Sequence, residues 1–257
     1  RCSLGKPGEF YSEELLHQMF GVNAELLIDH AWGYEPCTIA QIRAYKPQSS
    51  SLGCGQVLHC PYTADKARIV VQEMIDGISL ELVEKRLVTD QLVLTVGYDI
   101  ENLTRPEIRK VYKGPVTTDR YGRRVPKHAH GTWNLPRATS SSSELLEAMA
   151  ALYDKIVNPA LLIRRMSLSA CHVVNEKMAK EREQKETFEQ LDLFTDYAKK
   201  EAKEKEEQKK RERERRMQEA LLTIKKKYGK NAVLRGMNFE EGATAKERNG
   251  QIGGHQA

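Results

Sequence analysis

The sequence has 257 residues, with 41 Lys or Arg against 36 Asp or Glu and a formal net charge of +5 at pH 7, a length that allows one or two hydrophobic cores. No apolar stretch reaches the roughly 18 to 20 residues that a membrane-spanning helix needs, and the first residues lack the pattern of a secretory signal. The five cysteines, Cys2, Cys37, Cys54, Cys60 and Cys171, have neither disulfide-framework nor zinc-ribbon spacing, so we expect a reducing, cytoplasmic location.

The N-terminal part predicts two short helices. Their patterns, SEELLHQMF and NAELLIDHAW, lie within residues 11–32, and Ser12 and Asn23 are the expected N-caps. Two helices of this size cannot form a core alone. Residues 33–51 contain two prolines and a run of serines, which is the composition of a linker.

The middle of the chain predicts a small α+β domain. Apolar alternation predicts strands, and i, i+3, i+4 spacing predicts amphipathic helices, the second of which opens with a capping box at Ser141 and Glu144. In chain order the elements are a strand at 52–60, a helix at 63–85, strands at 91–98 and 131–136, a helix from 141, and a strand at 161–174. This split βαβ repeat gives a four-stranded sheet with both helices on one face.

The opposite face of this sheet is expected to stay open. The residues predicted to lie on it are Thr95, Thr132, Arg165, Ser167 and Ser169. Small hydroxyls and a guanidinium suit phosphate oxygens better than bases or apolar ligands. Two cysteines of the first strand, Cys54 and Cys60, are interpreted as small core residues.

A basic loop precedes the third strand. Residues 105–137 contain only Glu107 and Asp119 against Arg105, Arg109, Lys110, Lys113, Arg120, Arg123, Arg124, Lys127 and Arg137. Folded against the open face, the loop would contact phosphates; the alternative is a solvated loop that binds nothing. His128 and His130 have the spacing of paired metal ligands, but the sequence offers no third ligand nearby. Either imidazole could donate a hydrogen bond to phosphate instead.

Catalytic motifs are absent from the sequence. Phosphoryl transfer on nucleotides needs converging carboxylates that hold Mg²⁺. Asp99 and Glu101 are the only close acidic pair at a strand end, and ordinary turn chemistry explains them. No Walker loop, GxSxG motif or nucleophile and base set is found, so no catalytic or metal-binding residue is assigned.

The C-terminal part is a charged tail. More than half of residues 176–230 are charged, and pairs such as Glu207 and Arg211 at i, i+4 predict a solvated helix. Within it, QLDLF at 190–194 has the pattern of a peptide that inserts into another protein's pocket; the alternative is one helical turn packed on the sheet. Residues 231–257 are Gly-rich and expected to be flexible.

Five separated segments resemble, in order, the C-terminal part of Y-family lesion-bypass DNA polymerases of the UmuC/DinB type from Gram-positive bacteria. The resemblance covers nearly the whole chain. The segments are SSSLGCGQVLHCPYT at 49–63, LVLTVGY at 92–98, YGRRVPKHAHGTWNL at 121–135, LIRRMSLSA at 162–170, and the terminal KKYGKNAVLRG with EGATAKERNGQIGGH.

The resemblance implies a division into five parts. Residues 1–37 would be thumb helices, 38–50 a linker, 51–175 the little-finger domain, 176–230 the charged helical tail with a clamp-binding peptide, and 231–257 a flexible C-terminus. A little finger grips the backbone of primer-template DNA. Together with the basic loop, this implies DNA contacts at Ser49, Ser50, Ser51, Gly53, Arg120, Arg123, Arg124, Lys127, His128, His130, Thr132, Arg164, Arg165 and Ser167.

The resemblance also implies a second partner, the sliding clamp. The peptide Gln190, Leu191, Asp192, Leu193 and Phe194 would bind it, with Gln190 at the pocket rim and Leu193 and Phe194 filling the pocket. The palm and fingers, with the carboxylates that hold Mg²⁺, would precede Arg1, which indicates a processed or incomplete chain. We therefore expect this chain to hold no cofactor and to serve translesion synthesis and DNA repair by positioning DNA rather than by chemistry.

A non-enzymatic scaffold is the alternative from a different class. Its charged tail would bind RNA or a protein helix, and its sheet would hold no nucleic acid. Neither interpretation indicates an oligomeric state.

Overall fold

The computed structural model describes residues 12–45, 50–119, 122–179, 181, 197–252 and 255–256. Contacts divide the chain into two units, Arg1–Gln48 and Ser49–Ala257. In the described residues no helix combines the length and the apolar character needed to cross a membrane.

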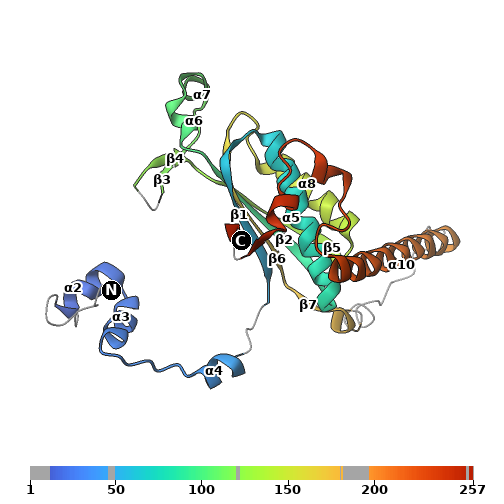
Figure 1. The fold of residues 1–257 in the computed structure, drawn as a ribbon, viewed down its shortest axis with the longest axis horizontal. Coiled ribbons are helices and arrows are strands. Elements are labelled where there is room, and N and C mark those ends of the chain that lie inside the picture. The colour runs from blue at the N-terminus through green and yellow to red at the C-terminus, as the bar shows by residue number, and fades with distance from the viewer. Residues whose placement is uncertain are drawn as a thin grey trace. The chain divides into compact units, whose positions relative to one another are not determined.

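The N-terminal unit contains three short helices. They are α2 (Glu13–Phe20), α3 (Asn23–Ala31) and α4 (Ile39–Ala44) (Figure 1). Ser12 caps α2 as predicted, because its hydroxyl accepts a hydrogen bond from the Leu15 N–H at 3.3 Å. The prediction for Asn23 was wrong: Val22 occupies the N-cap position, and Asn23 is the first helical residue.

Helix α4 lies inside the segment 38–50, which was expected to be a linker. Its start is a capping box: the Gln41 N–H donates to the Thr38 hydroxyl at 3.3 Å, and the Thr38 N–H donates to Gln41 Oε1 at 2.8 Å. Threonine followed three residues later by glutamine is a signature of a helix start. Within the described part of this unit only Ala24 is buried, in keeping with helices too short to build a core.

The second unit is built on one antiparallel sheet. In spatial order its strands are β1 (Leu52–Tyr62), β6 (Ile163–Cys171), β2 (Leu87–Tyr98) and β5 (Ala129–Thr139), and the short β7 (Val174–Asn175) also pairs with β2. The α+β class is confirmed, but the sheet has five strands where four were expected. The fifth forms because the chain turns back at His172, whose φ is 52°, and pairs Val174 with Val88.

Two helices, α5 (Ala64–Lys85) and α8 (Ser142–Ile156), cover one face of this sheet (Figure 1). Leu92, Leu94 and Leu168 are fully buried beneath them. Each such leucine stabilises the fold by roughly 2 kcal/mol. Ser141 caps α8, since its hydroxyl accepts from the Glu144 N–H at 3.3 Å, as the capping-box pattern predicted.

The segment between β2 and β5 is more ordered than the predicted loop. It contains α6 (Glu101–Thr104), α7 (Pro106–Val111), β3 (Val116–Thr118) and β4 (Arg124–Pro126), of which β3 and β4 pair with each other. Asn102 is fully buried at its base. Its amide donates to the carbonyls of Asp99 and Leu162 at 2.8 Å and accepts from the Leu162 N–H at 2.7 Å, which fixes the segment to the sheet.

The charged tail forms α10 (Tyr197–Tyr228), and its second half is docked rather than solvated. The predicted pair of Glu207 and Arg211 forms at 3.2 Å. Further along, the Glu214 carboxylate accepts from the Ser143 N–H at 2.8 Å at the start of α8, where helix N–H groups favour an anion. Gln218, 2% exposed, donates to the Ser142 hydroxyl at 2.8 Å. The prediction of a solvated helix is therefore wrong for this half.

Residues 231–250, here called the C-terminal strap, pack on α5 instead of being flexible. They include η1 (Gly236–Phe239) and α11 (Ala245–Arg248), and a short ribbon of β8 (Gln251–Ile252) and β9 (His255–Gln256) follows. Glu73 of α5, 4% exposed, accepts from the N–H groups of Thr244 at 2.8 Å and Ala245 at 3.0 Å. Arg235 pairs with Asp76 at 2.7 Å. Burial raises the pKa of the Asp76 carboxyl, and the Arg235 charge opposes that rise.

Candidate nucleic-acid interface

Side chains on the face away from α5 and α8 align in rows across the sheet. Antiparallel pairing sets Thr95 of β2 beside Ser167 of β6, and His130 of β5 beside Thr95. The next row contains, in spatial order, Gly53, Ser169, Val93 and Thr132. Ser167, His130 and Thr132 are exposed. Polar side chains from three neighbouring strands therefore share one accessible surface.

A β-bulge places two arginines at one end of these rows. Where β6 pairs with β2, Arg165 lies opposite Gly97 and Ile163 lies opposite Tyr98, so Arg164 is an extra residue. The bulge keeps Ile163 in the core while Arg165 is exposed and Arg164 half-buried. Two adjacent positions thus contribute positive charge without burying a guanidinium.

The two arginines differ in their partners. Arg164 Nε lies 3.8 Å from Asp99 Oδ2. The side chain of Arg165 forms neither an ion pair nor a hydrogen bond with any residue that the structure describes. An exposed guanidinium without an acidic neighbour is free to bind the oxygens of a phosphate through its fork of N–H donors.

Basic and imidazole groups lie at the start of β5. Thr95 Oγ1 is 2.9 Å from His130 Nδ1, and this hydrogen bond orients the imidazole. Lys127 and His128 are exposed immediately before the strand. The Lys127 N–H donates to the Pro115 carbonyl at 2.8 Å, which ties this end of β5 to the β3–β4 segment. The three predicted contact residues of this stretch therefore lie together.

Part of the basic loop is neutralised within the chain. Ion pairs join Arg105 to Glu101 at 2.6 Å, Arg123 to Asp119 at 2.8 Å, and Arg137 to Glu144. Arg123 remains about half exposed, and Arg124 of β4 is exposed. Arg120 lies outside the described residues. The loop therefore offers less free positive charge than its composition predicted.

The serines before β1 have different roles. The Ser50 hydroxyl donates to the Val173 carbonyl, and the Val173 N–H donates to the Ser50 carbonyl at 3.0 Å, so Ser50 joins the start of β1 to the chain after β6. Its hydroxyl therefore donates within the chain, and the DNA contact at Ser50 stays a prediction. Ser51 is exposed, whereas Ser49 lies outside the described residues.

The close carboxylates Asp99 and Glu101 are engaged locally. Asp99 Oδ1 accepts from the Glu101 N–H at 2.8 Å, which is the turn chemistry predicted for this pair, and Glu101 pairs with Arg105. In the part of the chain that the structure describes, no group of three or more His, Cys, Asp or Glu side chains could hold a metal ion.

The two cysteines of β1 have different environments. Cys54 packs against the core, and burial raises the pKa of its thiol although the Arg248 charge opposes the rise. Cys60 is exposed, so its interpretation as a core residue was wrong. The reason is that pairing of β1 with β6 is irregular beyond Val57, and strict alternation is lost there.

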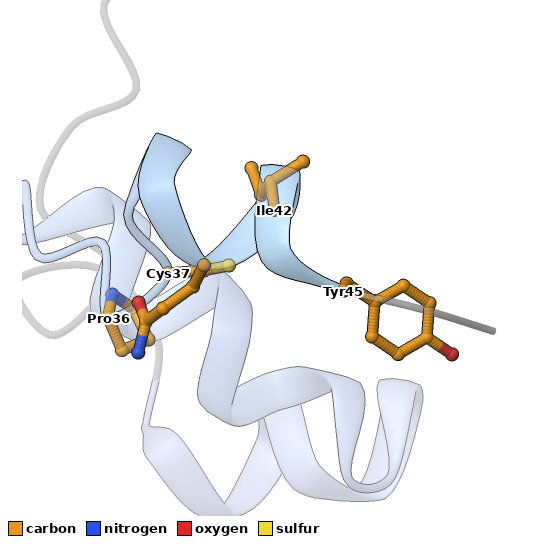
Figure 2. A pocket seen from close by; sticks show the side chains of 5 residues that line it. Pro36, Cys37, Ile42 and Tyr45 are labelled. Atoms are coloured by element: carbon orange, nitrogen blue, oxygen red, sulfur yellow. The ribbon is translucent and has the colours of Figure 1, made fainter.

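A pocket in the N-terminal unit offers little chemistry. Its lining residues are Pro36, Cys37, Gln41, Ile42 and Tyr45. Figure 2 shows Pro36 and Cys37 in the segment before α4, with Ile42 on the helix and Tyr45 just beyond it. The Gln41 amide oxygen is used by the capping box. The pocket is therefore mostly apolar surface beside one thiol.

The predicted clamp-binding residues, Gln190, Leu191, Asp192, Leu193 and Phe194, lie outside the described residues. Neither a protein-family model nor a curated protein sequence matches this chain. Support for a function therefore comes from the residues and the geometry of the open sheet face.

Sequence reasoning missed three features of this interface. The bulge at Arg164 has no local signature, because Arg164 and Arg165 read as consecutive residues of one strand. The anchoring role of Asn102 depends on Leu162, which is distant in the sequence. Gly97 was treated only as part of an alternating strand, yet a glycine inside a strand often marks a close approach of other atoms and could have been noted.

Proposed function

We propose that the second unit holds the backbone of primer-template DNA on its open sheet face, as the little finger of a Y-family translesion polymerase. The observation that carries this proposal is the exposed Arg165, without an acidic partner among the described residues, beside rows of hydroxyl and imidazole groups. Phosphate contacts of this kind add sequence-independent affinity. A protein that contacts only the DNA backbone, and not the bases, tolerates damaged bases in the template, which suits translesion synthesis and DNA repair.

The arrangement of the elements supports the same proposal. Strand, helix and strand (β1, α5, β2) are followed by strand, helix and strand (β5, α8, β6), and the two helices leave one sheet face uncovered. That order is the split repeat predicted from the sequence, which the resemblance assigns to a little finger. The alternative, a scaffold that acts through its charged tail, has less support, because Arg211, Arg215 and Lys226 of α10 pair with acidic residues of the body.

Replacing both Arg164 and Arg165 by Ala should weaken binding of the whole chain to primed duplex DNA roughly sixtyfold at about 0.1 M salt, because each lost phosphate contact removes close to one released counterion. The plot of log affinity against log salt should flatten by about two units. Fluorescence anisotropy of a labelled primer-template, measured over a series of salt concentrations, gives both quantities.

The matched control removes two exposed cations from α10, Lys209 and Arg213. Replacing both by Ala should leave DNA affinity within twofold of the original. The reverse pattern, with unchanged binding by the sheet variant and a large loss in the tail variant, would support the scaffold and overturn the proposal.

We further propose that Gln190–Phe194 docks the sliding clamp, which would compensate a loose DNA grip by raising the effective concentration of the protein at the primer end. The support is the sequence pattern of two adjacent apolar residues, Leu193 and Phe194, in a charged segment. Replacing both by Ala should weaken clamp binding at least tenfold, since anchor residues dominate such interfaces. Surface plasmon resonance on immobilised clamp tests this, and unchanged clamp affinity contradicts it; DNA affinity should stay the same.

A further inference from the structure

Gly97 of β2 lies under the side chain of Arg165. The two residues are register partners in neighbouring strands. A Cβ atom at position 97 would lie 2.7 Å from Arg165 Cγ, 3.3 Å from its Nε and 3.4 Å from its Cδ. Carbon atoms do not approach to 2.7 Å, so the arginine lies flat across β2 only because residue 97 has no side chain.

Backbone conformation does not explain this glycine. Gly97 is absent from the residues with positive φ, and it lies in the central strand β2 directly beside the bulge of β6. A glycine there costs about 0.5–1 kcal/mol relative to a residue with a side chain. The close approach of the Arg165 side chain, next to the bulge, gives a physical reason for its presence.

The flat arginine points to a single anion site above Gly97. Ala129 of β5 pairs with Val96, so Lys127 and His128, which precede Ala129, lie on the β5 side of this part of β2. Arg165 reaches over the same part of β2 from β6, on the opposite side. Basic residues of two strands thus flank the same part of β2.

We infer that Gly97 is a positioning residue that holds the Arg165 guanidinium flat over β2, where it binds one phosphate of the DNA backbone together with Lys127 or His128. The inference rests on the proposed function. It adds where one DNA phosphate binds and names Gly97 as the residue that positions Arg165 for this contact. A side chain at position 97 would force Arg165 to stand away from the sheet. Because the obstructed atoms belong to a flexible side chain rather than to backbone, the fold itself would remain.

Gly97→Ala should weaken binding of the whole chain to primed duplex DNA roughly eightfold at about 0.1 M salt, the effect of one lost phosphate contact. The salt slope should flatten by about 0.9. Arg165→Ala should do the same, and Gly97→Ala should have no further effect in the Arg165→Ala background, because both changes remove one interaction. Anisotropy titrations give the affinities, and thermal melting verifies that each variant is folded.

Gly55→Ala is the matched control. Gly55 is also a strand glycine, but a Cβ atom there would make only an ordinary contact, 3.6 Å from the Met166 carbonyl. The affinity of the Gly55→Ala variant for primed duplex DNA should stay within twofold of that of the unchanged chain. An equal loss in this control, or a loss from Gly97→Ala that persists in the Arg165→Ala background, would mean that the added methyl obstructs the surface, and the positioning role would be wrong.

Two further outcomes separate the inference from the function on which it rests. If the unchanged chain does not bind primed duplex DNA, the proposed function fails and the inference fails with it. If the chain binds and Arg165→Ala weakens binding while Gly97→Ala does not, the DNA-binding function stands and only the role of Gly97 is refuted.

Discussion

Replacing Glu73 by Ala should release the C-terminal strap and lower the free energy of unfolding by about 3 kcal/mol. The Glu73 carboxylate accepts hydrogen bonds from Asn238 Nδ2 and from the N–H groups of Thr244 and Ala245, all within 3.0 Å. Without it, two buried N–H groups lose their acceptor, or the strap leaves α5. Glu73→Gln should cost less, because the amide oxygen can still accept from the Thr244 and Ala245 N–H groups and only Asn238 Nδ2 would face a second donor.

Urea denaturation of the whole chain measures this loss, and hydrogen exchange measures the release of the strap. Glu241→Ala is the control, because Glu241 lies in the same strap and pairs with Lys66 on α5 but is exposed. An exposed ion pair contributes little, so the unfolding midpoint should stay unchanged. Equal effects of the two substitutions would contradict the assigned role of the buried carboxylate.

Gly131→Val should strongly destabilise the sheet, with a loss of about 3 kcal/mol of stability through overpacking. A Cβ atom at position 131 would lie 2.8 Å from Ile156 Cγ2 and 2.9 Å from Leu152 Cδ1. Both atoms are methyl groups of α8 side chains, and Leu152 is only 1% exposed, so it has no free space to move into. The neighbouring residues His130 and Thr132 would shift with β5.

Differential scanning calorimetry measures this effect, with Thr132→Val as the control. Thr132 is the next residue of β5, but its side chain faces away from α8 and is exposed. The control should change stability by less than about 0.5 kcal/mol. If Gly131→Val were as stable as the control, the packing of α8 against β5 would have been wrongly assigned.

The regular elements of the second unit were predictable because their patterns are local. Leu92, Leu94 and Val96 alternate as a half-buried strand must, and each is fully buried. Ser141 and Glu144 indicated the start of α8 in the same way. The start of one strand differed from its prediction: β2 begins at Leu87 rather than Gln91, since pairing with β7 extends it.

The docking of the C-terminal segments could not be predicted in this way. The sequence around Thr244 is polar and Gly-rich, and its hydrogen-bond acceptor, Glu73, is 171 residues away. Likewise, the sequence gives Glu214 and Gln218 the pattern of a solvated helix. Their contacts with the serines at the start of α8 are visible only in the structure. The spacing of apolar residues shows which face of a helix or strand is buried. It does not show which polar group will contact a carboxylate that is distant in the sequence.

The candidate site was predictable in composition but not in geometry. Ser167 and Thr132 lie on the open face because alternation fixes the side on which they project. The sequence alone did not show which basic residues lack an acidic partner. Arg137 and Glu144, for example, meet only after α8 packs on the sheet. Ser50 shows the same limit, since its hydrogen-bond partner Val173 lies 123 residues away.

The extra residue in β6 allows this strand to contain two consecutive arginines without burying either of them. Strict alternation allows only every second side chain to face water, so two consecutive arginines would send one guanidinium toward α5. The irregularity at Arg164 removes that conflict, because Ile163 still points inward while Arg165 points outward. Deleting Arg164 would restore regular alternation with Ile163 still pointing inward, so the strand would lose one cation and keep its core residue.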